Sequence, residues 1–150
     1  MRVVVQRVSR AEVRINGEEP RCIGPGLLLL LGVESGDTEE DAGWLVDKLL
    51  KLRIFDDADG ITNLSMTDVA AEVMVISQFT LLASTKKGTR PSYHRAAKPE
   101  LARELYGSFV RQMENETGRD VPTGTFGAHM DVELVNDGPV TLLLDSKNRE

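Results

Sequence analysis

The sequence predicts an α/β domain built in layers. Several short segments alternate apolar with polar residues, or run apolar throughout, as strands do, and two longer segments carry apolar residues at helical spacing. The predicted strands outnumber the helices, and the helices separate them, which is typical of helices packed against a sheet. No repeat or linker interrupts residues 1–150, so we expect one domain.

The composition indicates a soluble globular protein, with 41% hydrophobic and 28% charged residues. The longest apolar run, residues 23–33, is broken by Gly24, Pro25 and Gly26 and is shorter than the roughly 20 residues of a membrane helix. The N-terminal segment turns polar at Gln6 and lacks the apolar core of a signal peptide. We therefore expect a cytoplasmic protein with no membrane partner and a buried strand within 23–33.

The cysteine content and the net charge exclude some kinds of metal site and of nucleic-acid binding. The single cysteine, Cys22, excludes an internal disulfide and a cysteine-cluster zinc site, and we expect it to fill the core. A net charge of −6 argues against indiscriminate nucleic-acid binding, so DNA is not an expected partner. One basic stretch, Lys86 to Lys98, has five lysines and arginines and no acidic residue. It is either a solvated loop or the place where an anionic partner docks.

The N-terminal segments predict two strands followed by another strand and a helix. Residues 3–8 and 11–15 alternate, with a bend near Ser9-Arg10 and a turn at Asn16-Gly17. After a strand at 27–31, Asp37 is the expected N-cap, with Glu40 in a capping-box position. Trp44 lies beside the apolar face of this helix, which consists of Ala42, Leu45, Val46, Leu49 and Leu52.

The acidic segment from Asp56 to Gly60 raises the question of a calcium loop. When Gly60 is aligned with the invariant glycine of such a loop, Phe55 falls at the first ligand position and Met66 at the closing carboxylate. Neither side chain coordinates a hard cation. We therefore expect a turn here and no bound metal.

The second half predicts a strand, a helix and two final strands. Residues 61–71 are ambiguous, and residues 73–82 read as a strand that contains Ser77 and Gln78. Pro99 suits the first turn of a second helix, which Thr117-Gly118 ends. Its apolar face consists of Ala102, Leu105, Tyr106, Phe109, Val110 and Met113.

Gly138-Pro139 interrupts the final apolar pattern, between predicted strands at 130–136 and 140–144. Proline donates no hydrogen bond to a ladder, so the pair indicates a bulge, an edge strand or backbone that faces a ligand. A hairpin turn through Asn136-Asp137-Gly138 is the simpler alternative.

Two stretches carry a family resemblance. Residues 77–81 read SQFTL and residues 136–141 read NDGPVT, and both match motifs of the D-aminoacyl-tRNA deacylase family without a mismatch. The chain resembles that family over its whole length. Other segments that follow its pattern in order are 6–8, 24–27, 36–38, 51–55, 88–92 and 126–130.

The resemblance implies layered mixed β-sheets with helices packed on one face, and a homodimer with active sites at the subunit interface. It implies hydrolysis of the ester of D-aminoacyl-tRNA in chiral proofreading, without a cofactor. A hydroxyl of the terminal ribose helps to activate water, so the protein mainly holds and polarises the ester. If L side chains are refused by steric clash alone, glycyl-tRNA is a substrate as well.

The resemblance also assigns residue roles. The catalytic segment is Ser77, Gln78, Phe79 and Thr80, with backbone donors around Phe79 and Thr80. Gly138-Pro139 is expected to be cis, with carbonyls that enter the partner subunit's pocket and recognise the α-amino group. The substrate-binding residues are Leu81 beside the catalytic segment, Phe126 and Met130 as pocket walls, and Arg7, which fixes the Gly-Pro loop.

Each role has a plain alternative. Phe126 and Met130 also suit a core, Ser77 and Thr80 suit strand-end hydrogen bonds, and Arg7 suits a surface ion pair. Two rival functions remain. One is a hydrolase with Thr80 or Ser77 as a covalent nucleophile, and the other is a non-catalytic module that binds the tRNA end.

A covalent nucleophile needs a base within hydrogen-bond reach, and only His94 and His129 offer an imidazole. Both stand at positions that the family's motifs leave unspecified, so the resemblance gives them no role. We expect each to lie on the surface or to support the site. No HExxH or paired-histidine spacing supports a catalytic metal.

Overall fold

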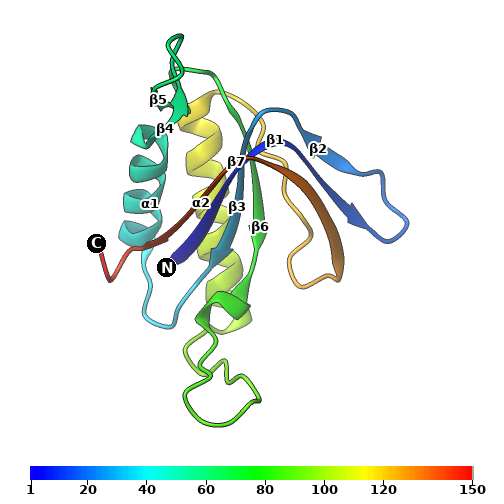
Figure 1. The fold of residues 1–150 in the computed structure, drawn as a ribbon. Coiled ribbons are helices and arrows are strands. Elements are labelled where there is room, and N and C mark those ends of the chain that lie inside the picture. Colours follow the sequence, from blue (N-terminus) through cyan, green and yellow to red (C-terminus); the bar gives the residue numbers. More distant parts are fainter. Residues whose placement is uncertain (150) are drawn as a thin grey trace.

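The computed structural model describes residues 1–149 and consists of a curled mixed sheet with two helices on one of its faces (Figure 1). The predicted α/β class is confirmed. The elements in chain order are β1 (Arg2–Ile15), β2 (Arg21–Ile23), β3 (Gly26–Gly32), α1 (Glu39–Lys51), β4 (Arg53–Asp56), β5 (Thr62–Ser65), β6 (Glu72–Ser77), the 3-10 turn η1 (Phe79–Leu82), α2 (Pro99–Thr117) and β7 (Met130–Asp145).

Strand β1 organises the sheet. One of its edges pairs antiparallel with β3 through residues 2–8 and then with β2 through residues 11–13. Its other edge pairs with β7 from Arg2↔Asp145 to Ile15↔Met130. Strand β6 extends the sheet beyond β3 as a parallel neighbour. Because β3 and β6 are parallel, their C-terminal ends lie side by side at the same end of the sheet.

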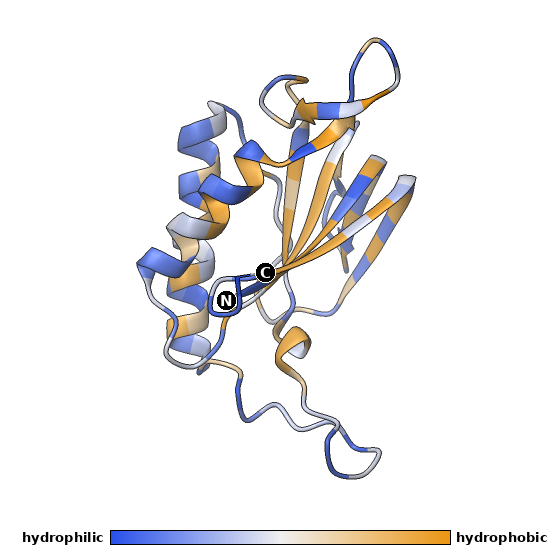
Figure 2. Ribbon diagram, turned by 60° about the vertical axis from the view of Figure 1, so that its left-hand side comes forward, coloured by the Kyte–Doolittle hydropathy of each residue, from blue (hydrophilic) through white to orange (hydrophobic). Residues whose placement is uncertain are grey.

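Apolar residues fill both faces of the sheet. The larger core joins Val3 and Val5 of β1, and their neighbours on β3 and β6, to α1 and α2. The smaller core lies on the opposite face, where the far halves of β1 and β7 curl over Leu28, Met74 and Ile76. In Figure 2 the strands are mainly orange, while the helices carry both blue and orange stretches. The sheet is thus covered by helices on one face and by its own curled end on the other.

Several expectations for the N-terminal half are wrong. The two predicted strands are one, β1, whose register against β7 shifts between Gln6 and Arg10. Cys22 is exposed, because it lies on the short edge strand β2. The buried strand expected at 27–31 is confirmed as β3, while residue 23, at the start of the same apolar run, belongs to β2.

The first helix begins one residue later than predicted. Thr38 is the N-cap, and its amide donates to Asp41 over 2.8 Å in a capping box. Asp37 instead accepts hydrogen bonds from the Met1 amino group over 2.7 Å and from the Glu34 amide over 2.6 Å. The predicted apolar face is buried up to Leu49, and Leu52 is the C-cap residue.

In the second half, the predicted strand at 73–82 ends early, at Ser77, and residues 79–82 form η1. The ambiguous segment contains β5, and the residues between Asp56 and Thr62 form the turn of the β4–β5 hairpin. Helix α2 begins at Pro99 and ends with Gly118 in the left-handed conformation, as predicted. The two final predicted strands are one strand, β7.

Neither α1 nor α2, nor any other helix within residues 1–149, is long and apolar enough to cross a membrane.

Candidate active site

A cleft of about 320 Å³ opens where β6 ends, between η1 and the segment that leads into β7. Its lining comes from the end of β6, the start of α2, the loop before β7 and the start of β7 itself. The lining residues are Val33, Ile76, Ser77, Gln78, Phe79, Ala102, Phe126, Gly127, Ala128, His129, Met130 and Val132.

Hydrogen bonds hold η1 against the end of β3 and the start of β1. The Gln78 amide donates to Leu31 O over 2.8 Å, and a guanidinium nitrogen of Arg2 donates to Leu81 O over 3.2 Å. Gly32 makes the approach possible, because a Cβ there would lie 2.6 Å from a methyl carbon of Leu82 and 2.9 Å from Gln78 O. The position of η1 thus depends on the lack of a Cβ at Gly32 of β3.

The amides of Phe79 and Thr80 begin the 3-10 turn, where backbone donors have no partner within the helix. Within residues 1–149 neither amide donates a hydrogen bond elsewhere. The Thr80 hydroxyl is occupied, since the side-chain amide of Gln78 donates to it. Two adjacent backbone donors are therefore available beside the cleft.

Aromatic and small residues build the opposite wall. The ring of Phe126 lies 6.0 Å from that of Tyr106, and the Arg103 guanidinium stacks over it at 5.0 Å. The Tyr106 hydroxyl donates to Val75 O over 2.8 Å, and burial raises the pKa of Tyr106 to about 12. Tyr106 therefore anchors the wall and stays protonated near neutral pH. A Cβ on Gly124 would lie 2.2 Å from the sulfur of Met130, so this glycine lets Met130 lie in the wall.

Gly138 and Pro139 lie on exposed backbone of β7, and the peptide bond between them is cis. Between the pairs Val8↔Asn136 and Gln6↔Thr141, β7 advances much further than β1, so the Gly-Pro pair bulges out of the ladder. Arg7 holds this bulge, because its Nε donates to Asp137 O over 2.9 Å and its Nη1 donates to Ile54 O over 2.6 Å.

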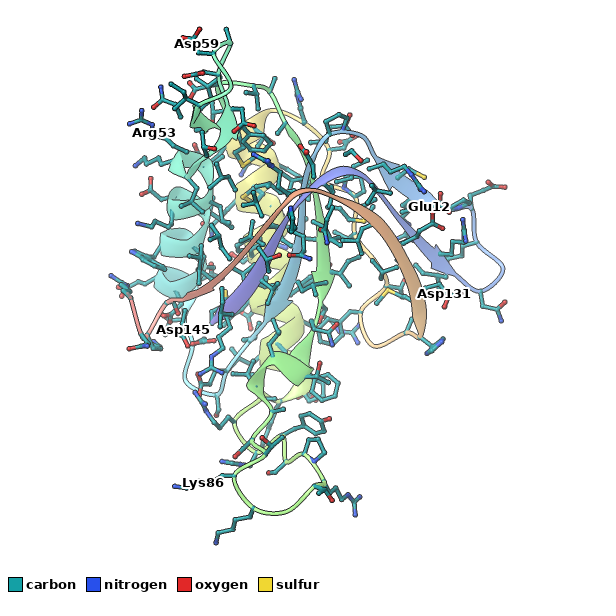
Figure 3. All side chains as sticks on the ribbon, in the orientation of Figure 1. Glu12, Arg53, Asp59, Lys86, Asp131 and Asp145 are labelled. Carbon is teal, nitrogen blue, oxygen red and sulfur yellow. The ribbon has the colours of Figure 1, made fainter. Side chains whose placement is uncertain are left out.

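The bulge and the cleft of one chain are well separated. Gly138 lies beside the part of β1 that pairs with the start of β3, whereas the cleft opens beyond the end of β6. The start of β7 lines the cleft through Met130 and Val132, and Gly138 lies six residues further along the strand, about 20 Å at roughly 3.3 Å per residue. Figure 3 labels Asp131 and Asp145 toward the two ends of β7, and the bulge lies between them.

The structure thus brings together five of the predicted site residues and leaves five outside the cleft. Ser77, Gln78, Phe79, Phe126 and Met130 line it. Thr80 and Leu81 lie in η1 beside the cleft, and Arg7 lies with Gly138 and Pro139 at the bulge. Six further lining residues were not assigned to the site. Gly127 and Ala128 fall within the segment 126–130 that follows the family's pattern, whereas the others are small or apolar residues with no chemical signal: Val33, Ile76, Ala102 and Val132.

The histidines do not pair with the candidate nucleophiles. His94 is exposed, and its Nδ1 lies 2.9 Å from the Ser92 hydroxyl. His129 lines the cleft, but among residues 1–149 no hydrogen bond joins either imidazole to Ser77 or Thr80. This arrangement gives no support to a covalent mechanism.

Comparison with known proteins identifies the family. The family model described as D-Tyr-tRNA(Tyr) deacylase matches residues 4–145. The chain belongs to this family. The D-aminoacyl-tRNA deacylase of Flavobacterium johnsoniae is 53% identical over 150 residues, which cover 100% of both chains. The resemblance in the sequence is therefore confirmed, and so, at the level of the family, is the expectation of a hydrolase that acts on aminoacyl-tRNA esters.

Solved structures agree with the fold. A structure named c-Myc DNA Unwinding Element Binding Protein has a TM-score of 0.90 and 40% identity, with 97% of this chain and 98% of that chain covered. A probable eukaryotic D-amino acid tRNA deacylase has a TM-score of 0.85, 19% identity and coverage of 95% and 97%. The expected layered sheet with helices on one face is confirmed.

Proposed function

We propose that this protein hydrolyses the ester that joins a D-amino acid, or glycine, to the 3′ end of tRNA. The observation that carries the proposal is the pair of unoccupied amides at Phe79 and Thr80 beside a cleft walled by Phe126 and Met130. Family membership supports the substrate class, because the curated relatives are named for this reaction.

The two amides stabilise the charge that develops on the ester carbonyl oxygen during attack. A well-placed backbone donor of this kind contributes about 3 kcal/mol to the transition state. Water is activated with the help of the neighbouring hydroxyl on the terminal ribose. Help from the substrate's own hydroxyl accounts for the lack, within residues 1–149, of any hydrogen bond between a histidine and Thr80.

Gly138 and Pro139 act in the cleft of the partner subunit of a homodimer. Their separation from the cleft of their own chain supports this assignment, and so does the position of β7 at the edge of the sheet. Within the described residues β7 pairs only with β1, and Leu143 and Val135 on it are exposed. An edge strand with exposed apolar side chains suits a subunit interface.

The backbone of the Gly-Pro bulge provides the chiral selection. Its carbonyls bind the α-amino group and occupy the space that an L side chain needs, so L substrates are refused by clash. A site that selects by exclusion cannot refuse a smaller group, because an unfilled pocket forfeits only about 1–3 kcal/mol per methylene. Glycyl-tRNA is therefore a substrate together with D-aminoacyl-tRNA.

Deacylation of D-alanyl-, glycyl- and L-alanyl-tRNA at equal protein concentration tests the proposal, with protein-free samples as the control for spontaneous hydrolysis. We expect the first two esters to be cleaved and L-alanyl-tRNA to be spared. Resistance of glycyl-tRNA alongside cleavage of D-alanyl-tRNA would show that the site grips the D side chain. Binding of D-alanyl-tRNA without ester loss would indicate a non-catalytic module instead.

A further inference from the structure

A basic loop projects from the molecule next to the cleft. It begins after Ser84 and returns at Ser92, where two backbone hydrogen bonds of 2.8 and 2.9 Å join these residues. In Figure 3 Lys86 lies on this loop, beyond η1 and away from the sheet. Its exposed cations are Lys86, Lys87 and Arg90.

These three cations differ from the eight of the other fifteen lysines and arginines that form ion pairs within residues 1–149. Arg2, Arg7 and Arg10, for example, are in ion pairs with carboxylates. Within residues 1–149, no acidic side chain pairs with Lys86, Lys87 or Arg90. In a protein of net charge −6, the loop is a local concentration of uncompensated positive charge.

The base of the loop is fixed to the elements that form the cleft. The ring of Tyr93 packs edge-on against that of Phe79 at 5.0 Å, and Phe79 lines the cleft. Arg95 pairs with Glu34 at 2.6 Å, and the Ser35 amide donates to Arg95 O over 2.8 Å. The loop is thus held at a fixed position relative to the cleft mouth.

Two more cations continue from the loop to the cleft. Lys98 immediately precedes α2, and Arg103 lies just over one turn into that helix, where it stacks on Phe126 in the cleft wall. Neither residue forms an ion pair within the described part of the chain. The positive charge therefore extends from the loop tip to the wall of the cleft.

We propose that this basic track, defined as Lys86, Lys87, Arg90, Lys98 and Arg103, binds the phosphates of the tRNA acceptor stem and leads its 3′ end into the cleft. The inference rests on the proposed function, since it takes aminoacyl-tRNA as the ligand of the cleft. Lysine and arginine contacts to phosphate release counterions, so this binding weakens with salt and is insensitive to base sequence.

The test measures binding rather than catalysis. The probe is tRNA that carries D-alanine through a non-hydrolysable amide at its 3′ end, and its dissociation constant is measured between 50 and 200 mM salt. The loop variant combines Lys86→Gln, Lys87→Gln and Arg90→Gln. The control variant combines Lys48→Gln, Lys51→Gln and Arg111→Gln, which change the net charge equally on exposed helix positions.

We expect the loop variant to bind about tenfold or more weakly at the lower salt concentrations. The slope of log affinity against log salt should fall by about one for each phosphate that the variant no longer binds. The control variant should keep a slope close to that of the unmodified protein. Equal effects of the two variants would overturn the inference, because they would show that only net charge matters.

A minihelix of the acceptor stem with the same 3′ amide locates the binding site of the loop on the tRNA. It should bind the unmodified protein as tightly as the full tRNA does and should weaken by the same factor with the loop variant. Weaker binding of the minihelix than of the full tRNA would place the loop against another part of the tRNA and overturn the inference. Ester hydrolysis is measured separately. Binding through the loop without hydrolysis would contradict the proposed function alone.

Discussion

The hydroxyl and the amide of Thr80 give different expectations for mutagenesis. The hydroxyl accepts a hydrogen bond from Gln78, whereas the amide beside the cleft donates no hydrogen bond within residues 1–149. Thr80→Ala removes the hydroxyl and keeps the amide, so we expect the kcat/KM of deacylation to stay within about tenfold of that of the unmodified protein. Loss of a true nucleophile costs several orders of magnitude, about 10⁶ in a well-studied protease. A loss of that size in folded Thr80→Ala, measured as kcat/KM, would contradict the mechanism.

At the level of single residues, the sequence identifies the residues that line the cleft better than it predicts their hydrogen-bond partners. Ser77, Gln78 and Phe79 belong to a recognisable motif, and the structure places them in the cleft with Phe126 and Met130. The predicted capping role of Asp37 is wrong, because the sequence pattern does not show that the Met1 amino group is its partner. Such contacts join residues far apart in the chain, and no local pattern records them.

The contact between β3 and η1 makes Gly32 a test of how β3 positions η1 and its two proposed oxyanion donors. In Gly32→Ala the new methyl would meet Leu82 and Gln78 O, so η1 must move away from β3. We expect a loss of stability of about 1–3 kcal/mol from overpacking and a larger loss of deacylation, because the amides of Phe79 and Thr80 shift.

Gly43→Ala is the matched control for Gly32→Ala. Gly43 lies within α1, and the nearest atom to an added Cβ is 3.5 Å away, so alanine there meets no clash. It should stabilise the helix by about 0.5–1 kcal/mol. Denaturant unfolding and deacylation assays of both variants check the pair. Full activity of Gly32→Ala would show that η1 is not held by β3.

Helix α1 should make stability depend on pH through Asp41. Burial opposes ionisation of this carboxyl, but hydrogen bonds from Lys147, Ser146 and the Thr38 amide outweigh it and lower its pKa from 3.8 to about 2. The stabilisation is complete above pH 3.8 and is lost as the pH falls toward 2. We expect Asp41→Asn to cost about 2 kcal/mol at pH 7 and much less at pH 2.5. Urea unfolding at both pH values measures this, and a cost that does not change with pH would refute the assignment.

At the scale of the whole molecule, the class of the fold is predictable from the sequence but the continuity of its long strands is not. The sequence pattern predicts a break at Ser9-Arg10, yet β1 continues through it with a change of register and both residues exposed. The pattern also predicts that a strand ends before Pro139, yet β7 continues past it because the proline lies in a bulge on an edge strand. Strand continuity depends on neighbours that a local pattern does not contain.

If the Gly138-Pro139 bulge acts in the cleft of the partner subunit, two inactive variants should restore each other's deacylation activity in a mixed dimer. A bulge variant, Gly138→Val, disrupts the Gly-Pro bulge, since even a Cβ would lie 2.9 Å from the Val140 amide nitrogen. A cleft variant, Ala128→Phe, fills the cleft with bulk. If the bulge acts in the partner's cleft, a mixed dimer has one site in which both parts are intact.

Equal amounts of the two variants, allowed to exchange subunits, should form mixed dimers in about half of the population. With one intact site of two in each mixed dimer, the mixture should recover about a quarter of the unmodified activity, while each variant alone stays inactive. Subunit exchange is followed independently with tagged chains, and deacylation of D-alanyl-tRNA is the readout. Exchange without any recovery would mean that Gly138 and Pro139 serve the cleft of their own chain, despite the length of β7 that separates them from Met130 and Val132 in its lining.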